Sequence, residues 1–336
     1  MVSRLSLPIR LRLPPGLGRA FWVAALILLG AELSLHSEPV LHQYRSVFAV
    51  GRAIDKLDYV ETHSPRVLFI GNSRTDNGVD PRALSQALGK PATYSFNLGL
   101  PGANLIVYQG LVERLAAQGK LGPAGIHSVV LGLDESAFQN DNSLGYIGFL
   151  ADRASLWESG RYLDWLGSYQ RLWSYSPNLR QLREPEKLLR FVEASTKPVD
   201  PVGGAAGDFQ GYRAGFGGAQ NQDQVVRQES EAQQPPAADV VPFLWKTIDR
   251  LHALGVRVFV TVPPLRDRRS AFFDAEPDTA PYRELLHALA QRGVGVLPEP
   301  SGFQPGEFIN AGHLNDSGAQ RYSQALAQQL IARGVK

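Results

Sequence analysis

The sequence predicts an α/β fold built on a parallel β-sheet, and two observations lead to this fold class. First, short apolar runs rich in β-branched residues alternate with stretches in which apolar residues recur at helical spacing. Second, the order strand, helix, strand, helix, strand before residue 135 implies parallel strands joined by right-handed crossovers. With 44% hydrophobic and 20% charged residues over 336 positions, the chain has the composition of a globular protein with a sizeable core.

The first half of the predicted sheet lies between residues 65 and 144. Its first strand, RVLFIG, is a continuous apolar run that ends in glycine, as expected of a parallel strand buried on both faces. Asp80 and Pro81 provide the N-cap and first-turn signals of the helix that follows. The expected elements, in chain order, are a strand at 66–71, a helix at 80–89, a strand at 93–100, a helix at 104–120 and a strand at 127–134.

The α/β pattern resumes after a long interruption. The expected elements there are a helix at 240–254, a strand at 256–264, a helix at 280–292, a strand at 294–297 and a helix from 317 onward. We therefore predict one α/β domain formed by residues 65–144 and 240–336. Residues 145–239 are expected to be an inserted cap, with an aromatic helical part and then a flexible loop rich in Gly and Gln. The tryptophans and tyrosines of the cap favour a small helical core, with stacking on sugar rings as the alternative.

The N-terminus has the layout of a membrane signal. Residues 1–19 carry four arginines, and an apolar run from Ala20 to Ala31 follows them. We expect an uncleaved signal-anchor or transmembrane helix at 20–36, a linker and helix at 37–64, and a basic end left in the bacterial cytoplasm. The α/β domain would then be periplasmic or extracytoplasmic. A buried amphipathic helix is the alternative interpretation.

Composition excludes several classes of function. The chain has no cysteine, which removes disulfides, zinc–thiolate sites and a cysteine nucleophile. Its formal net charge is +2 and the basic residues are scattered, so nucleic acid is not an expected partner. There is no HExxH pattern and no metal-ligand spacing among the acidic residues and histidines, and we expect neither a metal nor a cofactor.

One serine lies where α/β proteins bind ligands. The stretch FIGNSRTDNG places Ser73 directly after the first strand, at the carboxyl edge of the predicted sheet. A serine nucleophile needs a base, and histidine is the usual one at neutral pH. Among the seven histidines, His313 stands out because it lies in a loop-like segment just before the last helix. Arg74 and Thr75 follow the serine, and a structural role for them is favoured over substrate contact.

Three motifs together resemble those of the SGNH (GDSL-like) hydrolases: GNSRT, then FNLGLPG, then FINAGHLNDSG near the C-terminus. The resemblance implies a three-layer, flavodoxin-like sheet and a serine enzyme without a cofactor. Carried over position by position, Ser73 looks like the nucleophile and one oxyanion donor, and Gly102 like the second donor. His313 looks like the base. Within the family, the chain is most similar to membrane-anchored bacterial members tied to acylation of envelope glycans or exopolysaccharides.

Two positions depart from the family pattern. Asn310 stands where the family has the triad acid, three residues before His313. Asparagine can orient an imidazole but cannot stabilise its charge, and Glu307 or Asp316 could approach His313 instead. Asp134 stands where the third family motif has an oxyanion-donating Asn. A carboxylate would repel an oxyanion there, so Asp134 either caps a helix or faces elsewhere, and the hole is formed by Ser73 and Gly102.

These observations predict an extracytoplasmic serine esterase or O-acyltransferase that acts on acyl esters of a cell-envelope or exopolysaccharide glycan. It would use a Ser–His dyad or an atypical triad with Asn310. The alternative is a non-catalytic binding or assembly partner of polysaccharide export or modification machinery, which kept the fold and lost the acid. A nucleotide-binding protein is not favoured, because neither GxGxxG nor a Walker A motif follows the first strand.

Overall fold

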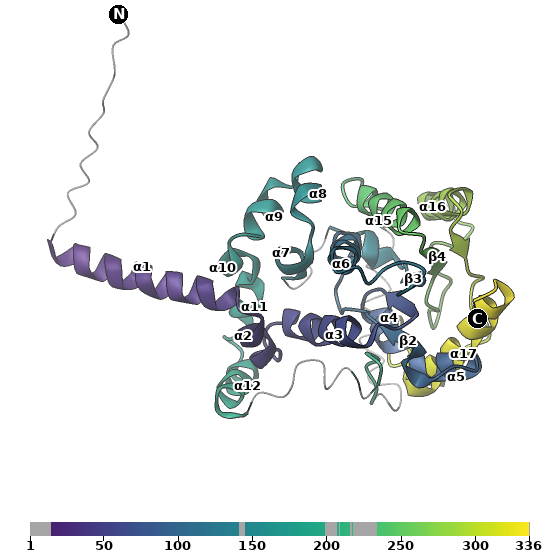
Figure 1. Cartoon of the computed structure of the whole chain (residues 1–336), viewed down its shortest axis with the longest axis horizontal. Coiled ribbons are helices and arrows are strands. Elements are labelled where there is room, and N and C mark those ends of the chain that lie inside the picture. The colour runs from purple at the N-terminus through teal and green to yellow at the C-terminus, as the bar shows by residue number, and fades with distance from the viewer. Residues whose placement is uncertain are drawn as a thin grey trace, which may run out of the picture.

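The structure is a computed structural model that describes residues 15–140, 145–198, 207, 209–215, 217 and 234–335. A long helix, α1 (Pro15–Leu35), projects from an α/β body (Figure 1). Residues 1–14, which include most of the predicted cytoplasmic end, lie outside the described residues, as does most of the predicted Gly/Gln-rich loop.

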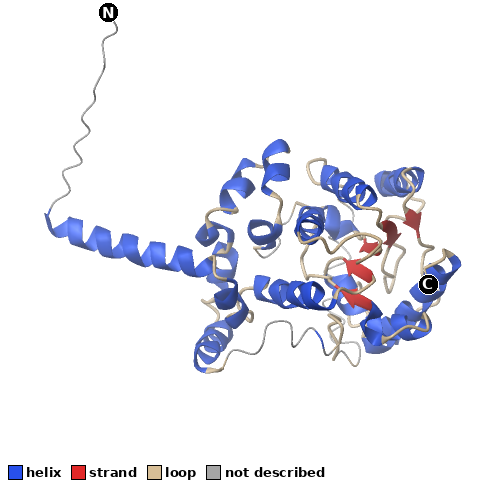
Figure 2. Ribbon diagram, in the orientation of Figure 1, coloured by secondary structure: helices blue, strands red, loops and turns tan. Residues whose placement is uncertain are grey.

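The body is built on one five-stranded sheet in which every strand is parallel to its neighbours (Figure 2). The strands are β1 (Val67–Ile70), β2 (Ser95–Asn97), β3 (Ser128–Gly132), β4 (Arg257–Thr261) and β5 (Gly295–Val296). Their order is β2-β1-β3-β4-β5, the order of flavodoxin-like sheets. The predicted α/β class and parallel sheet are confirmed, and the arrangement is compatible with a three-layer flavodoxin-like fold.

Alternate residues of each strand enter two separate cores, which explains the continuous apolar runs. Leu68 and Ile70 face a core shared with one group of helices, whereas Val67 and Phe69 face a smaller core on the opposite side. The first group of helices comprises α3 (Val50–His63), α6 (Leu105–Ala117), α15 (Val241–Ala253) and α16 (Ala280–Gln291). The opposite side is covered by α5 (Pro81–Ala87) and α17 (Asp316–Ala332).

The inserted residues form a run of short helices. These are α7 (Tyr146–Leu150), α8 (Arg153–Glu158), α9 (Tyr162–Gly167), α10 (Arg171–Ser174), α11 (Ser176–Gln181) and α12 (Pro185–Thr196). A later part of the insertion, residues 209–215, lies beside the edge strand β2. There the backbone N–H of Asn97 donates to the carbonyl of Gln210. This contact uses a backbone donor that an open edge would leave unpaired.

The single long apolar helix near the N-terminus is consistent with a signal-anchor or one membrane pass. Its 21 residues span about 30 Å, the thickness of a bilayer core. It begins at Pro15, five residues before the expected start, and most of its apolar side chains are exposed. Near its end, Glu32 accepts hydrogen bonds from the backbone N–H groups of Arg171 and Leu172. The helix is therefore joined to the cap through α10.

Thr75 packs closely against the carboxyl ends of β1 and β3, because Gly71 and Gly132 carry no side chain there. A Cβ at Gly71 would lie 1.9 Å from Thr75 Oγ1, and a Cβ at Gly132 would lie 2.0 Å from the same atom. The buried Thr75 side chain thus fills the space between the two strand ends. This contact places α4 (Ser73–Gly78) at the point where the chain connections leave the sheet in opposite directions.

Replacing Gly132 by alanine should destabilise the protein. The added methyl would overlap the Thr75 hydroxyl, and overpacking of this kind costs about 1–3 kcal/mol. Gly306→Ala is the matched control, since a Cβ at Gly306 would meet nothing within 4 Å. Urea unfolding of the full chain in detergent, followed by circular dichroism, measures the difference. Equal midpoints for the two variants would contradict the close packing of β1, β3 and Thr75.

Candidate active site

Ser73 is the first residue of α4, three positions beyond the end of β1. The preceding residue, Asn72, caps this helix: its side-chain oxygen accepts a hydrogen bond from the N–H of Arg74 at 3.0 Å. Ser73 itself is partly exposed, whereas Asn72 is buried. The serine hydroxyl therefore reaches solvent at the sheet edge while its backbone is held by a buried cap.

Ser73, His313 and Asn310 are joined by a chain of hydrogen bonds. The Oγ of Ser73 lies 2.8 Å from His313 Nε2, and His313 Nδ1 lies 2.9 Å from Asn310 Oδ1. The serine and the histidine are 240 positions apart in the sequence. The fold thus brings together the three residues that the sequence singled out as nucleophile, base and occupant of the acid position.

The surroundings of Asn310 determine which nitrogen of His313 carries the proton. Asn310 Oδ1 also accepts hydrogen bonds from the backbone N–H groups of Gly312 and His313, at 3.1 and 3.0 Å. These two donors fix the side-chain oxygen, rather than the amide nitrogen, toward the ring. Neutral His313 must therefore donate from Nδ1 to Asn310, which leaves Nε2 as the acceptor of the Ser73 hydroxyl. This is the tautomer that a general base needs.

A tight loop before α17 holds the histidine. The N–H of Ile309 donates to the carbonyl of His313 at 2.8 Å, and Phe308 and Leu314 form an isolated antiparallel bridge. The next residue, Asn315, caps α17 by accepting a hydrogen bond from the N–H of Gly318. The loop is therefore closed by its own backbone and fixed at the start of a long helix.

The charge environment of His313 disfavours protonation. Burial is the main cause and the charge of Arg74 the second, and together they lower the pKa of His313 to about 4. The carboxylates of Asp134 and Asp76 act in the opposite direction but do not outweigh them. The imidazole is consequently neutral at pH 7 and available to accept a proton.

Asp134 forms part of a buried polar network beside the serine. Its carboxylate accepts hydrogen bonds from Asn72 Nδ2 at 2.9 and 2.8 Å, and from the Ser136 hydroxyl at 2.6 Å. It also caps the short helix η2 (Glu135–Phe138) through the N–H of Ala137. The helix-capping alternative considered for Asp134 thus matches the geometry.

The carboxyl group of Asp134 is ionised despite its burial. Burial alone would raise its pKa, but the charge of Arg74 and the hydrogen bonds from Ser136, Asn72 and Ala137 hold the pKa below its usual value. Arg74 Nε lies 3.5 Å from this carboxylate, and Arg74 Nη1 lies 3.2 Å from Glu135. Arg74 therefore has the structural role that the sequence analysis favoured for it.

The two alternative carboxylates near the histidine have other partners. Glu307 closes a capping box with Gln304 and pairs with Arg321 at 2.8 Å. Asp316 accepts hydrogen bonds from the hydroxyl of Tyr212 and from the N–H of Gly215, both in the inserted residues. Asn310 is thus the side chain that orients His313.

The loop after β2 passes beside the serine. The N–H of Leu100 donates to the carbonyl of Gly71 at 2.9 Å, and a Cβ at Gly99 would lie 2.6 Å from the backbone nitrogen of Asp76 in α4. Gly102, in the same loop, is exposed and has a φ of +77°, which favours glycine. Among the described residues, the N–H groups of Ser73 and Gly102 make no hydrogen bond, so both are available to a ligand.

A buried lysine below the site escaped the sequence analysis. Lys56 Nζ donates to Asp76 Oδ1 at 2.7 Å and to the carbonyl of Gly99 at 2.6 Å, and Arg52 also pairs with Asp76. Burial lowers the pKa of Lys56 to about 8. The lysine connects α3 with α4 and the loop after β2. In the sequence Lys56 is one of several charged residues of α3, so no pattern marks it out.

The described residues contain no cluster of three or more histidine, cysteine, aspartate or glutamate side chains that could hold a metal ion.

A comparison with protein-family models gives no match to the chain, and a comparison with curated proteins gives none either. The geometry of the residues themselves is therefore the basis for a functional proposal.

The imidazole of His313 should titrate with a pKa of about 4, well below that of an ordinary histidine, because burial and Arg74 oppose its charge. NMR of the histidine-labelled full chain, with His313→Gln used to assign the signal, measures this pKa. The imidazole is neutral above about pH 4 and becomes protonated below it. A midpoint between 6 and 7 would contradict the described environment.

Proposed function

We propose that this chain is a serine esterase or O-acyltransferase of the SGNH (GDSL-like) hydrolase type. The observation that carries the proposal is the continuous hydrogen-bonded chain from Ser73 through His313 to Asn310. The N–H groups of Ser73 and Gly102, which make no hydrogen bond within the described part of the chain, would supply the donors that a tetrahedral oxyanion requires. A nucleophile, an oriented base and an oxyanion site together define acyl-transfer chemistry.

The chemistry would proceed in two steps. Ser73 Oγ attacks the ester carbonyl while its proton passes to His313 Nε2, and the N–H groups of Ser73 and Gly102 stabilise the oxyanion. The intermediate then collapses to an acyl-serine, and His313 returns the proton to the departing alcohol. In the second step His313 removes a proton from water or from an acceptor hydroxyl, which attacks the acyl-serine and frees Ser73. Water gives an esterase, and a sugar hydroxyl gives a transferase.

The apolar helix α1 supports the location that we propose. A span at the N-terminus with arginines before it supports a domain held outside the bacterial cytoplasmic membrane. Acyl esters of a cell-envelope or exopolysaccharide glycan are the substrates we propose there, with envelope polysaccharide machinery as the partner.

One observation favours a non-catalytic role as the second candidate. Asn310 is neutral and Arg74 is a cation next to Gly312 in the histidine loop. An imidazolium formed during catalysis would thus have Asn310, and no carboxylate, as its hydrogen-bond partner among the described residues. A protein that uses the same fold to bind glycans during export or modification would tolerate this arrangement. The following experiment separates the two candidates.

A fluorophosphonate probe should label the full chain at Ser73. Ser73→Ala should abolish both the labelling and the hydrolysis of p-nitrophenyl acetate, because no other oxygen nucleophile is hydrogen-bonded to His313 among the described residues. Ser301→Ala, at an exposed serine in another loop, is the matched control and should behave as the unchanged protein. Absence of labelling in the folded, unchanged chain would overturn the enzyme proposal and favour the binding role.

Asn310→Asp should raise the catalytic rate by roughly tenfold or more, since the reverse change in a serine protease triad costs about 10⁴. The new carboxylate would keep the two backbone hydrogen bonds to its oxygen and would stabilise the imidazolium. The pKa that governs the acid limb of the pH–rate profile should rise from its starting value of about 4, because the carboxylate favours the protonated imidazole. Asn310→Ala should slow the enzyme at all pH values because the ring loses its orientation. A slower Asn310→Asp enzyme with an unshifted profile would refute the assigned role.

A further inference from the structure

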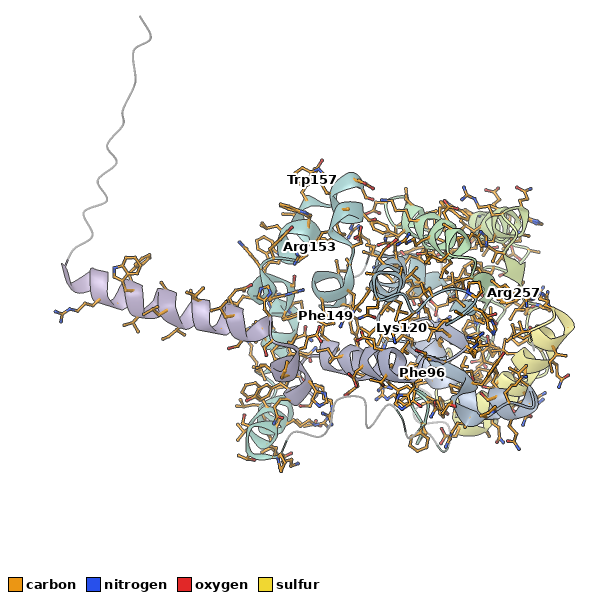
Figure 3. All side chains as sticks on the ribbon, in the orientation of Figure 1. Phe96, Lys120, Phe149, Arg153, Trp157 and Arg257 are labelled. Atoms are coloured by element: carbon orange, nitrogen blue, oxygen red, sulfur yellow. The ribbon has the colours of Figure 1, made fainter. Side chains whose placement is uncertain are left out.

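Most of the large apolar side chains that are exposed outside α1, among the described residues, lie on the cap helices α8 to α12. Figure 1 shows α8 to α12 gathered on the side of the body from which α1 projects, and Figure 3 places Trp157 and Arg153 on this same side. Leu163 is 68% exposed and Leu189 is 59% exposed. We call the exposed apolar and aromatic residues of these helices the cap face. The cap face consists of Trp157, Tyr162, Leu163, Tyr169, Trp173, Leu188, Leu189 and Val192. An exposed apolar set of this kind marks an interaction surface.

The cap face is held close to the end of α1. The carboxylate of Glu32 accepts the N–H groups of Arg171 and Leu172 at 2.6 and 2.9 Å, and His36 lies 3.2 Å from the carbonyl of Tyr169. Since α1 ends at Leu35, α10 lies at the point where the apolar helix stops. Trp173 belongs to α10 itself, so its exposed ring is at the same level.

A second attachment holds α12 near the same point. The helix α2 (Glu38–Gln43) directly follows α1, and the next residue, Tyr44, stacks on Phe191 of α12 with ring centroids 4.5 Å apart. None of the twelve residues of α12 is buried. Its apolar stripe runs from Phe191 through Leu188 and Val192 to Leu189 at helical spacing, so only one edge of the stripe is covered.

The composition of the cap face matches a lipid interface. Tryptophan and tyrosine prefer the boundary between acyl chains and headgroups, because their rings are apolar and carry one polar group. The other side of α12 is polar and carries Lys187, Arg190, Glu186 and Glu193, so the helix is amphipathic, as are helices that lie flat on a membrane. The aromatic rings are also fixed before any ligand arrives: Trp157 contacts Tyr162 and Trp165 edge to face, and Trp165 contacts Tyr169.

We propose that the cap face rests on the outer surface of the bilayer that α1 spans, with the exposed side chains of α8, α9, α10 and α12 inserted at the headgroup level. This inference rests on the proposed membrane span and is independent of the proposed catalysis. The protein would therefore be held by one transmembrane helix and by a second, peripheral contact. The site would face the glycan layer from a fixed height above the lipid.

The absence of cysteine permits a direct test, because a single introduced cysteine can be labelled without background. The full chain would be reconstituted in vesicles of three parts phosphatidylethanolamine to one part phosphatidylglycerol. Spin labels at Leu189→Cys and Leu163→Cys report collisions with oxygen, which enters lipid, and with a nickel chelate, which stays in water. Ile331→Cys is the matched control: Ile331 is 43% exposed and lies on α17, away from the cap.

The expected result is an oxygen-to-nickel collision ratio several-fold higher at Leu189 and Leu163 than at Ile331. Equal ratios at the three positions, while a label at Leu26→Cys in α1 reports lipid, would overturn the inference and leave the membrane span intact. That outcome would favour the alternative in which the aromatic side chains of the cap stack on sugar rings. Low collision rates with both reagents would also overturn it, because they indicate a protein partner.

Two further readouts keep the proposals apart. A label at Leu26→Cys that reports water would refute the membrane span as well. Fluorophosphonate labelling of Ser73 in the same vesicles tests catalysis separately.

Discussion

The ionised carboxylate of Asp134 is the interaction on which the candidate site depends. It is almost fully buried, and it binds the side chain of Asn72, which in turn caps the helix that begins with Ser73. Arg74 balances this buried charge and also pairs with Glu135, whose carboxylate accepts hydrogen bonds from the hydroxyl of Ser270 and the N–H of Ala271. The loops after β1, β3 and β4 are thereby fixed to one another. Removing one member would leave a buried charge unpaired, at a cost of about 3–5 kcal/mol.

The same network sets the chemistry of the base. Arg74 is needed to neutralise the carboxylates beside it, yet its guanidinium lies next to Gly312 and opposes a proton on His313. Each unit by which the pKa of the base falls costs about 1.4 kcal/mol of stabilisation of the imidazolium. A carboxylate at position 310 would offset this cost, but Asn310 supplies orientation alone. The arrangement keeps the base neutral down to low pH and would make each proton transfer in the proposed reaction more demanding.

The sequence predicted the fold more completely than the site. Apolar runs such as RVLFIG predict a buried strand because alternate residues must enter two cores, and each of the five expected strands is present. Ser73 and His313 could be singled out by position, since Ser73 directly follows the first expected strand and His313 lies in a loop-like segment just before the last helix. The partners of Lys56 and Glu135 could not be predicted, because these contacts join helices and loops far apart in the chain and follow no periodic spacing. The effect of Arg74 on His313 depends in the same way on distances that only the folded chain defines.

The insertion touches both the cap face and the surroundings of the site. Its helices bind the end of α1 through Glu32, while its later residues bind the α/β domain: Tyr212 donates to Asp316 in α17, and the N–H of Arg213 donates to the carbonyl of Asp76 in α4. The segment that includes Arg213 thus contacts the helix that carries Ser73. An insertion fixed at both ends orients the sheet relative to α1 more firmly than a linker would. If the cap face rests on lipid, that orientation determines how far above the membrane a ligand meets Ser73.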